Sequence, residues 1–168
     1  MRILLTAACA LTATTCLQAV DGPPLADTDA TRLAAEVLLG SPGFEAGVAG
    51  EFRWHNSTEW QIRPELFINE DERVGAAVSL SWDLAPVFTL PAGHELFLGP
   101  RVAYHNSDHS KWGFDAMALY SFPLFPDREF RHNIEIMGTV GILQHRDDSD
   151  KVSSRFGASL GVGYAYRF

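Results

Sequence analysis

The last 17 residues of the chain, residues 152–168 (VSSRFGASLGVGYAYRF), alternate between two kinds of side chain. The even-numbered positions are mostly apolar and become aromatic toward the end, whereas the odd-numbered positions are small or charged. A period of two indicates a β-strand, because successive side chains of a strand point to opposite faces. This strand ends the sequence with an aromatic residue, Phe168.

The first 19 residues have the pattern of a secretory signal peptide. Arg2 supplies a short basic region, residues 3–17 are apolar, and Leu17-Gln18-Ala19 is an acceptable cleavage site. The apolar run is shorter than the roughly 20 residues of a transmembrane helix. We therefore expect export and a mature chain that begins near Val20.

The mature chain is long enough for one domain and is acidic. The formal net charge is −8, and removal of the segment that holds Arg2 would make it −9. An acidic chain without a basic patch argues against nucleic acid as a partner. Cys9 and Cys16 both lie in the leader, so the expected mature chain has no disulfide and no thiolate metal site.

Period-two alternation begins at Gly43 and continues to the C-terminus. Residues 20–42 are interpreted as a periplasmic linker or short helix that could include a first short strand, and residues 43–168 as one β-barrel. Seven strands are expected, at residues 43–54, 59–68, 73–83, 95–105, 111–122, 130–145 and 152–168.

An eighth strand is expected because bacterial membrane barrels have an even number of strands. It lies either at residues 33–39 or at residues 87–90. The second position is favoured, because Trp54-His55-Asn56-Ser57 resembles Tyr104-His105-Asn106-Ser107. That similarity would place both turns at the same end of the barrel.

Charged residues are confined to one face of the seven expected strands. The apolar face has none. The other face carries eight acidic residues, Glu45, Glu51, Glu59, Glu65, Asp83, Glu95, Asp115 and Glu135. It also carries eight basic residues, Arg53, Arg63, Arg73, Arg101, Lys111, Arg131, Arg155 and Arg167. Equal numbers of opposite charges suit an ion-pair network.

Three features favour an apolar face that points outward to lipid. The charged face is rich in Gly, Ala and Ser at mid-strand, as a crowded interior requires. Several strands exceed the usual soluble length of about 5–6 residues and reach the roughly 9–11 that a tilted membrane strand needs. Aromatic residues lie near strand ends, as in membrane-interface girdles: Trp54, Trp60, Trp82, Trp112, Tyr164, Tyr166 and Phe168. The alternative is a soluble periplasmic lipid-binding barrel with the apolar face inside.

The signal segment, the alternation and the ending Gly161-Val162-Gly163-Tyr164-Ala165-Tyr166-Arg167-Phe168 together resemble small outer-membrane proteins of the OmpA transmembrane domain and OmpX type. The resemblance implies an all-β fold, an eight-stranded antiparallel up-and-down transmembrane β-barrel. It implies a bacterial outer-membrane location, lipid and lipopolysaccharide as surroundings, and recognition of Phe168 by the barrel-assembly machinery. We expect a monomer without a cofactor and with a structural or interaction role rather than an enzymatic one.

The expected interior ion pairs are formed by Glu51, Arg53, Arg63, Glu65, Arg101, Asp115, Glu135 and Arg155.

Two weaker patterns could carry chemistry. His105-x-Ser107 resembles the His-x-Ser element of lipid A deacylases, in which a serine activated by histidine attacks an acyl ester. Asp115 or Glu135 would then have to orient His105. His55, His105 and His145 follow strand ends and would bind a divalent cation if they met at one rim.

Overall fold

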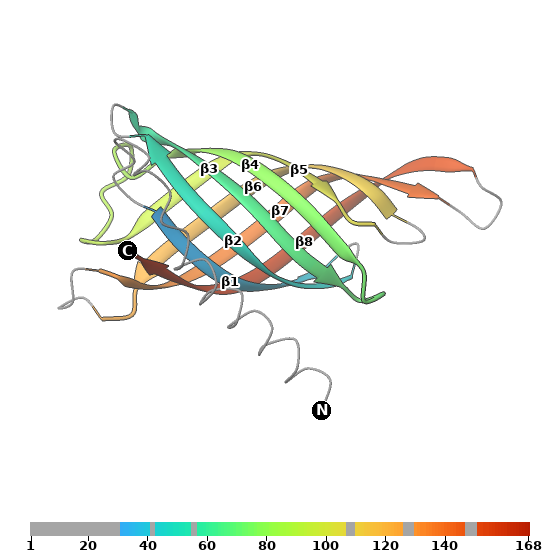
Figure 1. The fold of residues 1–168 in the computed structure, drawn as a ribbon. Coiled ribbons are helices and arrows are strands. Elements are labelled where there is room, and N and C mark those ends of the chain that lie inside the picture. Colours follow the sequence, from blue (N-terminus) through green and yellow to red (C-terminus); the bar gives the residue numbers. More distant parts are fainter. Residues whose placement is uncertain (1–30, 41–42, 55–56, 107–109, 126–129, 147–150) are drawn as a thin grey trace.

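The structure, a computed structural model, describes residues 31–40, 43–54, 57–106, 110–125, 130–146 and 151–168. They form a closed barrel in which every strand pairs antiparallel with its neighbours in chain order (Figure 1). The strands are β1 (Thr31–Gly40), β2 (Phe44–Trp54), β3 (Ser57–Asn69), β4 (Val74–Asp83), β5 (Glu95–Tyr104), β6 (Ser110–Pro123), β7 (His132–Arg146) and β8 (Val152–Arg167). Within these ranges, no helix is long and apolar enough to cross a membrane.

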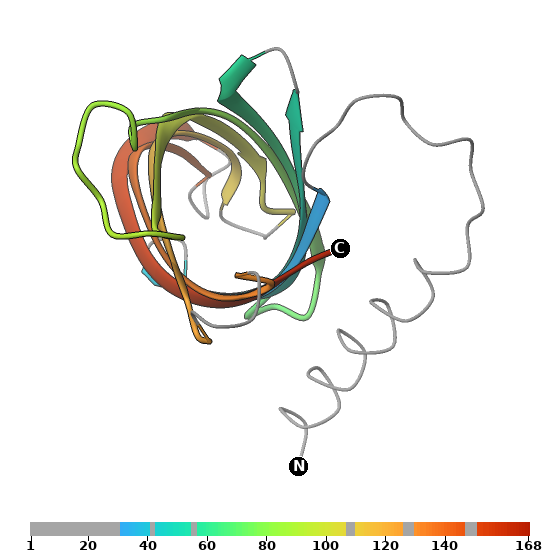
Figure 2. The ribbon, with the colours of Figure 1, turned by 90° about the vertical axis from the view of Figure 1, so that its left-hand side faces the viewer.

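The barrel closes where β1 pairs with β8. Arg32 faces Arg167 across this pair, so the start of β1 and the end of β8 lie at one end of the barrel, called here the termini end. Figure 2 views the closed ring from this end. The last residues of β1, β3, β5 and β7 lie at the opposite end, called the hairpin end, where β7 and β8 extend beyond the ring (Figure 1).

The apolar face of the sheet points outward all round the barrel. On β8, Phe156, Leu160 and Val162 are 75%, 65% and 56% exposed, whereas the inward Glu135 on β7 is 1% exposed. An apolar exterior with a polar interior is the arrangement of a membrane-spanning barrel, in which every backbone group is paired within the sheet. The eight-stranded transmembrane fold is therefore confirmed, and a soluble barrel with an apolar binding cavity is excluded.

The preferred position of the eighth strand was wrong. The eighth strand is β1 (Thr31–Gly40), which also excludes a helix there, and residues 87–90 belong to the β4–β5 loop. In that loop the amide of Val87 donates to the carbonyl of Leu84, which turns the chain away from the sheet. β1 instead pairs along its length with both β2 and β8, which satisfies its backbone on both sides.

The resemblance between the segments that follow Trp54 and Tyr104 was also misleading. β2 runs toward the termini end and β5 toward the hairpin end, so these two strand ends lie at opposite ends of the barrel.

Glycines inside the barrel leave room for large side chains on neighbouring strands. A Cβ on Gly75 would lie 2.2 Å from Cε2 of the Phe67 ring. One on Gly141 would lie 2.1 Å from the backbone carbonyl oxygen of Phe114 and 2.7 Å from Oδ1 of Asp115. Contacts under 3.0 Å are not tolerated. Bulky or charged neighbours thus occupy the space that the small residues on this face leave free.

Aromatic rings lie on the outer surface toward both ends. Trp60 and Trp82 stack with ring centroids 5.4 Å apart at the termini end, and Trp112 packs 5.0 Å from Tyr104 at the hairpin end. Further rings at the termini end are those of Tyr164 and Tyr166 on β8 and of Phe168, which directly follows β8. The side chain of Trp54 lies outside the described part of the chain.

Two histidines join this outer ring of aromatic side chains, which the sequence did not indicate. Nδ1 of His94 lies 2.6 Å from the hydroxyl of Tyr120, and Nδ1 of His132 lies 2.5 Å from that of Tyr164.

The outward face of β8 provides a test of the membrane assignment. Leu160→Arg should lower the free energy of unfolding in lipid vesicles by about 2–4 kcal/mol, because it places a charge near the middle of the apolar band. Ser154→Arg is the matched control: it lies on the same face of the same strand, in the exposed hairpin, and should change little. Urea titrations monitored by tryptophan fluorescence measure both. Equal effects of the two substitutions would contradict the assignment.

Candidate functional site

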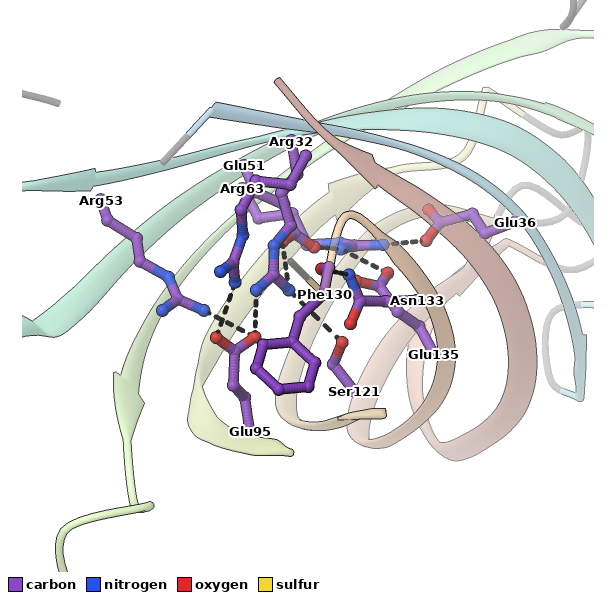
Figure 3. A network of polar contacts seen from close by, with 11 residues as sticks. Arg32, Glu36, Glu51, Arg53, Arg63, Glu95, Ser121, Phe130, Asn133 and Glu135 are labelled. Atoms are coloured by element: carbon purple, nitrogen blue, oxygen red, sulfur yellow. Dashed lines mark hydrogen bonds and ion pairs between the residues drawn. The ribbon is translucent and has the colours of Figure 1, made fainter. Parts of the chain in front are cut away.

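The centre of the barrel lumen is organised around the Arg63 guanidinium. Arg63 points inward from the middle of β3, is fully buried, and pairs with carboxylates from four strand positions (Figure 3). Its Nη1 contacts Glu51 and lies 3.1 Å from Oε2 of Glu135. Its Nη2 pairs with Glu36, and its Nε lies 3.7 Å from Oε1 of Glu65. One guanidinium therefore links β1, β2, β3 and β7 across the lumen.

A second group of ion pairs lies toward the hairpin end. Arg101 on β5 donates through Nη2 to Oε2 of Glu65 at 2.7 Å and through Nη1 to Oδ2 of Asp115 at 3.2 Å. Just beyond β5, His105 lies with Nδ1 2.5 Å from Oε1 of Glu45. Charge-assisted bonds of this kind are among the stronger hydrogen bonds in proteins. They tie β2, β3, β5 and β6 together.

A third group lies toward the termini end and is centred on Glu95 of β5. Nη2 of Arg53 is 2.9 Å from Oε2 of Glu95, and Nη2 of Arg167 donates to Oε1 at 2.9 Å. Arg32 pairs with the same carboxylate and also donates to the hydroxyl of Ser121 at 3.3 Å. Figure 3 shows Arg32 and Arg53 converging on Glu95. Three guanidinium groups thus share one carboxylate.

Apolar side chains fill part of the same interior. Phe97, Met117, Leu119 and Met137 are buried on the inward faces of β5, β6 and β7, and they form a cluster with Leu38. The guanidinium of Arg53 lies 4.7 Å from the centre of the Phe97 ring, so the charged and apolar parts are in contact. An eight-stranded barrel has an interior just wide enough to be filled by side chains in this way.

Acidic groups outnumber basic ones among the inward-facing residues that the structure describes. Eight acids point inward, Glu36, Glu45, Glu51, Glu65, Asp83, Glu95, Asp115 and Glu135, against five arginines, Arg32, Arg53, Arg63, Arg101 and Arg167. The predicted balance of opposite charges is therefore not observed. The reason is that Arg73, Lys111, Arg131 and Arg155 lie near strand ends and are exposed.

The structure brings most of the predicted interior residues together. Seven of them take part in the contacts described above: Glu51, Arg53, Arg63, Glu65, Arg101, Asp115 and Glu135. Arg155 does not, because it lies in the exposed β7–β8 hairpin beyond the ring. Arg32 and Glu36 were missed, although the alternation of Leu33, Ala35, Val37 and Leu39 already placed them on the opposite face.

Of the predicted hydrolase geometry, the structure describes only the part around His105. Its side chain is 2% exposed and faces the lumen, so an acyl chain in the surrounding lipid has no access to it. The carboxylate that orients Nδ1 is Glu45, whereas Asp115 pairs with Arg101 and Glu135 with Arg63. Ser107 lies outside the described residues.

The predicted metal rim is likewise described only in part. Among the described residues, no group of three or more His, Cys, Asp or Glu side chains could hold a metal ion. His105 and His145 both lie at the hairpin end, but His105 is engaged by Glu45 inside the lumen. His55 lies outside the described part of the chain.

Comparison with known proteins adds a structural similarity. No protein-family model matches the sequence, and no curated protein matches it. Among solved structures, the chain is similar to the crystal structure of Neisserial surface protein A (NspA), with 13% sequence identity and a TM-score of 0.44. The match covers 83% of this chain and 95% of that one. A similarity at this level carries no conclusion about activity.

Because several carboxylates share Arg63, we expect substitution of this residue to lower the stability of the barrel strongly. Arg63→Gln should lower the free energy of unfolding by about 3–5 kcal/mol, because several buried carboxylates lose their counter-charge while staying buried. Arg155→Gln, which removes an exposed arginine from the hairpin, should change it by less than about 0.5 kcal/mol. Denaturant titration of the refolded protein in detergent micelles measures both values.

Replacement of Arg63 by lysine should restore only part of the stability, because an ammonium group cannot reproduce the forked geometry of guanidinium. Equal stability of Arg63→Gln and Arg155→Gln would show that the central network does not stabilise the barrel.

Proposed function

We propose that this protein is an integral barrel of the bacterial outer membrane with a packed, ion-paired lumen and a non-enzymatic, structural or interaction-bearing role. The observation that carries the proposal is the burial of Arg63 among carboxylates from opposite walls of the barrel, inside an apolar exterior. A lumen crossed by such contacts is a filled core rather than an open pore. The strands then serve to hold their connecting segments at the two membrane surfaces.

The length and patterning of the strands support insertion into a bilayer. The strands contain 10 to 16 residues, enough for a tilted strand to cross the apolar layer. Export by the N-terminal segment would deliver the chain to the periplasm, and the terminal strand ending in Phe168 would then be recognised by the barrel-assembly machinery. The termini end accordingly faces the periplasm, and the protein acts as a monomer surrounded by phospholipid and lipopolysaccharide.

A lipid A deacylase is the less favoured alternative. It needs a histidine that reaches substrate from the membrane side, and His105 lies on the lumen side with Glu45. Incubation with lipopolysaccharide should therefore release no fatty acid. Release that is abolished by Ser107→Ala would favour this alternative instead.

Conductance measurement tests the packed lumen. The mature protein, refolded in detergent, should migrate differently in electrophoresis before and after boiling, as a stable barrel does. Reconstituted in a planar lipid bilayer, it should show no resolved current steps, because side chains from opposite walls meet across the lumen. Recurrent single-channel steps, or a mature protein that stays in solution without detergent, would contradict the proposal.

A further inference from the structure

The sign of the charge changes along the lumen. At the termini end, Arg32, Arg53 and Arg167 surround Glu95. Asp83 at the same end accepts a hydrogen bond at 2.8 Å from the backbone amide of Ala85. Three guanidinium groups thus lie with two carboxylates at this end, and Nη1 of Arg32 also lies 3.7 Å from Oε2 of Glu51, which pairs more closely with Arg63. In the rest of the lumen carboxylates are in excess, as the six around Arg63 and Arg101 illustrate: Glu36, Glu45, Glu51, Glu65, Asp115 and Glu135.

Two of the three arginines at the termini end are in contact with water, whereas the third, Arg32, is 1% exposed. The side chains of Arg53 and Arg167 are 17% and 27% exposed, whereas Arg63 is fully buried and Arg101 is 2% exposed. A charged group that approaches the barrel from the solution at this end would therefore meet positive charge first.

Two N–H donors of this cluster lack a hydrogen-bond acceptor. Nε of Arg32 and Nε of Arg167 are buried without a hydrogen-bond acceptor in the described part of the chain. Glu95 already accepts through both of its oxygens, so it has little capacity to satisfy further N–H groups. Guanidinium groups bind carboxylate and phosphate through paired N–H donors, and that geometry gives these anions specificity as well as affinity.

One arginine of the cluster also packs on an aromatic ring. The Arg53 guanidinium lies over the Phe97 ring, which restrains it. Phe130, two residues before β7, is drawn with this network in Figure 3. Phe130 has a φ of 53°, an uncommon value for a bulky residue. Its carbonyl accepts a hydrogen bond from Nδ2 of Asn133 at 2.9 Å, and its ring packs against the backbone of Gly93, where a Cβ would lie 2.6 Å from Cδ1.

We propose that Arg53 and Arg167, supported by Arg32 around Glu95, form a binding site for a phosphate or carboxylate group presented from the aqueous side at the termini end of the barrel. Glu95 holds the three guanidinium groups together in the absence of the ligand. An entering anion adds counter-charge for Arg53 and Arg167, which share Glu95 with Arg32, whereas Arg32 also lies 3.7 Å from Oε2 of Glu51. The proposal does not depend on which compartment this end faces, and it goes beyond the scaffold role proposed above.

The test uses the refolded mature protein in a non-ionic maltoside detergent, with pyrophosphate and citrate as probes. Thermal unfolding is followed at increasing probe concentration, with sodium chloride added to keep the ionic strength constant. We expect a saturable rise in melting temperature, as for any ligand that binds only the folded state. No rise beyond that in chloride alone would overturn the proposal.

Substitutions assign the effect to the cluster. Arg53→Gln and Arg167→Gln should each weaken pyrophosphate binding about tenfold, which corresponds to roughly 1.4 kcal/mol. Arg155→Gln, which removes one arginine far from the cluster, should leave binding unchanged. Equal binding by Arg53→Gln, Arg167→Gln and the unsubstituted protein would overturn the proposal.

Glu95→Gln gives an independent result if the arginine variants fail to refold. It removes the competing carboxylate but keeps its shape, so pyrophosphate should bind more tightly, by about tenfold. Unchanged or weaker binding would contradict the proposal.

A final arm separates a soluble ligand from a lipid headgroup. A short-chain phosphatidylglycerol is added to the same micelles in place of pyrophosphate. Stabilisation by this lipid without any by pyrophosphate or citrate would place the effect on the outer surface and overturn a site in the lumen mouth.

Discussion

Pairing of β1 with β8 is the constraint on which the rest of the structure depends. A sheet edge cannot be left open in a hydrocarbon environment, because its unpaired backbone groups would find no water to bond to. Once Arg32 faces Arg167 and the ring is closed, each residue must point either to lipid or to the interior. The inward side chains are then enclosed in a narrow space, where their charged and polar groups must find partners.

Charged side chains in that space are costly unless they are paired, and the pairing here is shared rather than one to one. Arg63 pairs with carboxylates from three other strands, and Glu95 is bound by three arginines. Shared contacts of this type connect strands that are distant in the ring. The centre of the lumen and its termini end therefore differ in local charge. Carboxylates are in excess around Arg63, and guanidinium groups are in excess around Glu95.

The location of each potential functional group follows from the same two-faced geometry. His105, which in sequence resembles part of a hydrolase motif, lies on the inward face and is paired with Glu45. His94 and His132, by contrast, lie on the outer surface. There they contact Tyr120 and Tyr164 in the band of aromatic side chains at the termini end. In such a barrel the charged side chains that water can reach, such as Arg53 and Arg167, lie at the mouth of the lumen and not on the lipid-facing wall.

The sequence by itself determined the transmembrane barrel and the side of each strand on which charge lies. Alternation with period two is local, so residues 152–168 alone reveal the face that carries Leu160 and the face that carries Gly161. It did not determine that β1 closes the ring, since residues 33–39 are short and compatible with either a strand or a helix until β2 and β8 pair with them. It also did not determine which charges meet: Arg63 and Glu135 are 72 positions apart, and only the stagger of the closed ring brings them to 3.1 Å. Strand ends were the least predictable part, because Arg155 has the correct alternation for the lumen but lies beyond the ring, where no opposite wall exists.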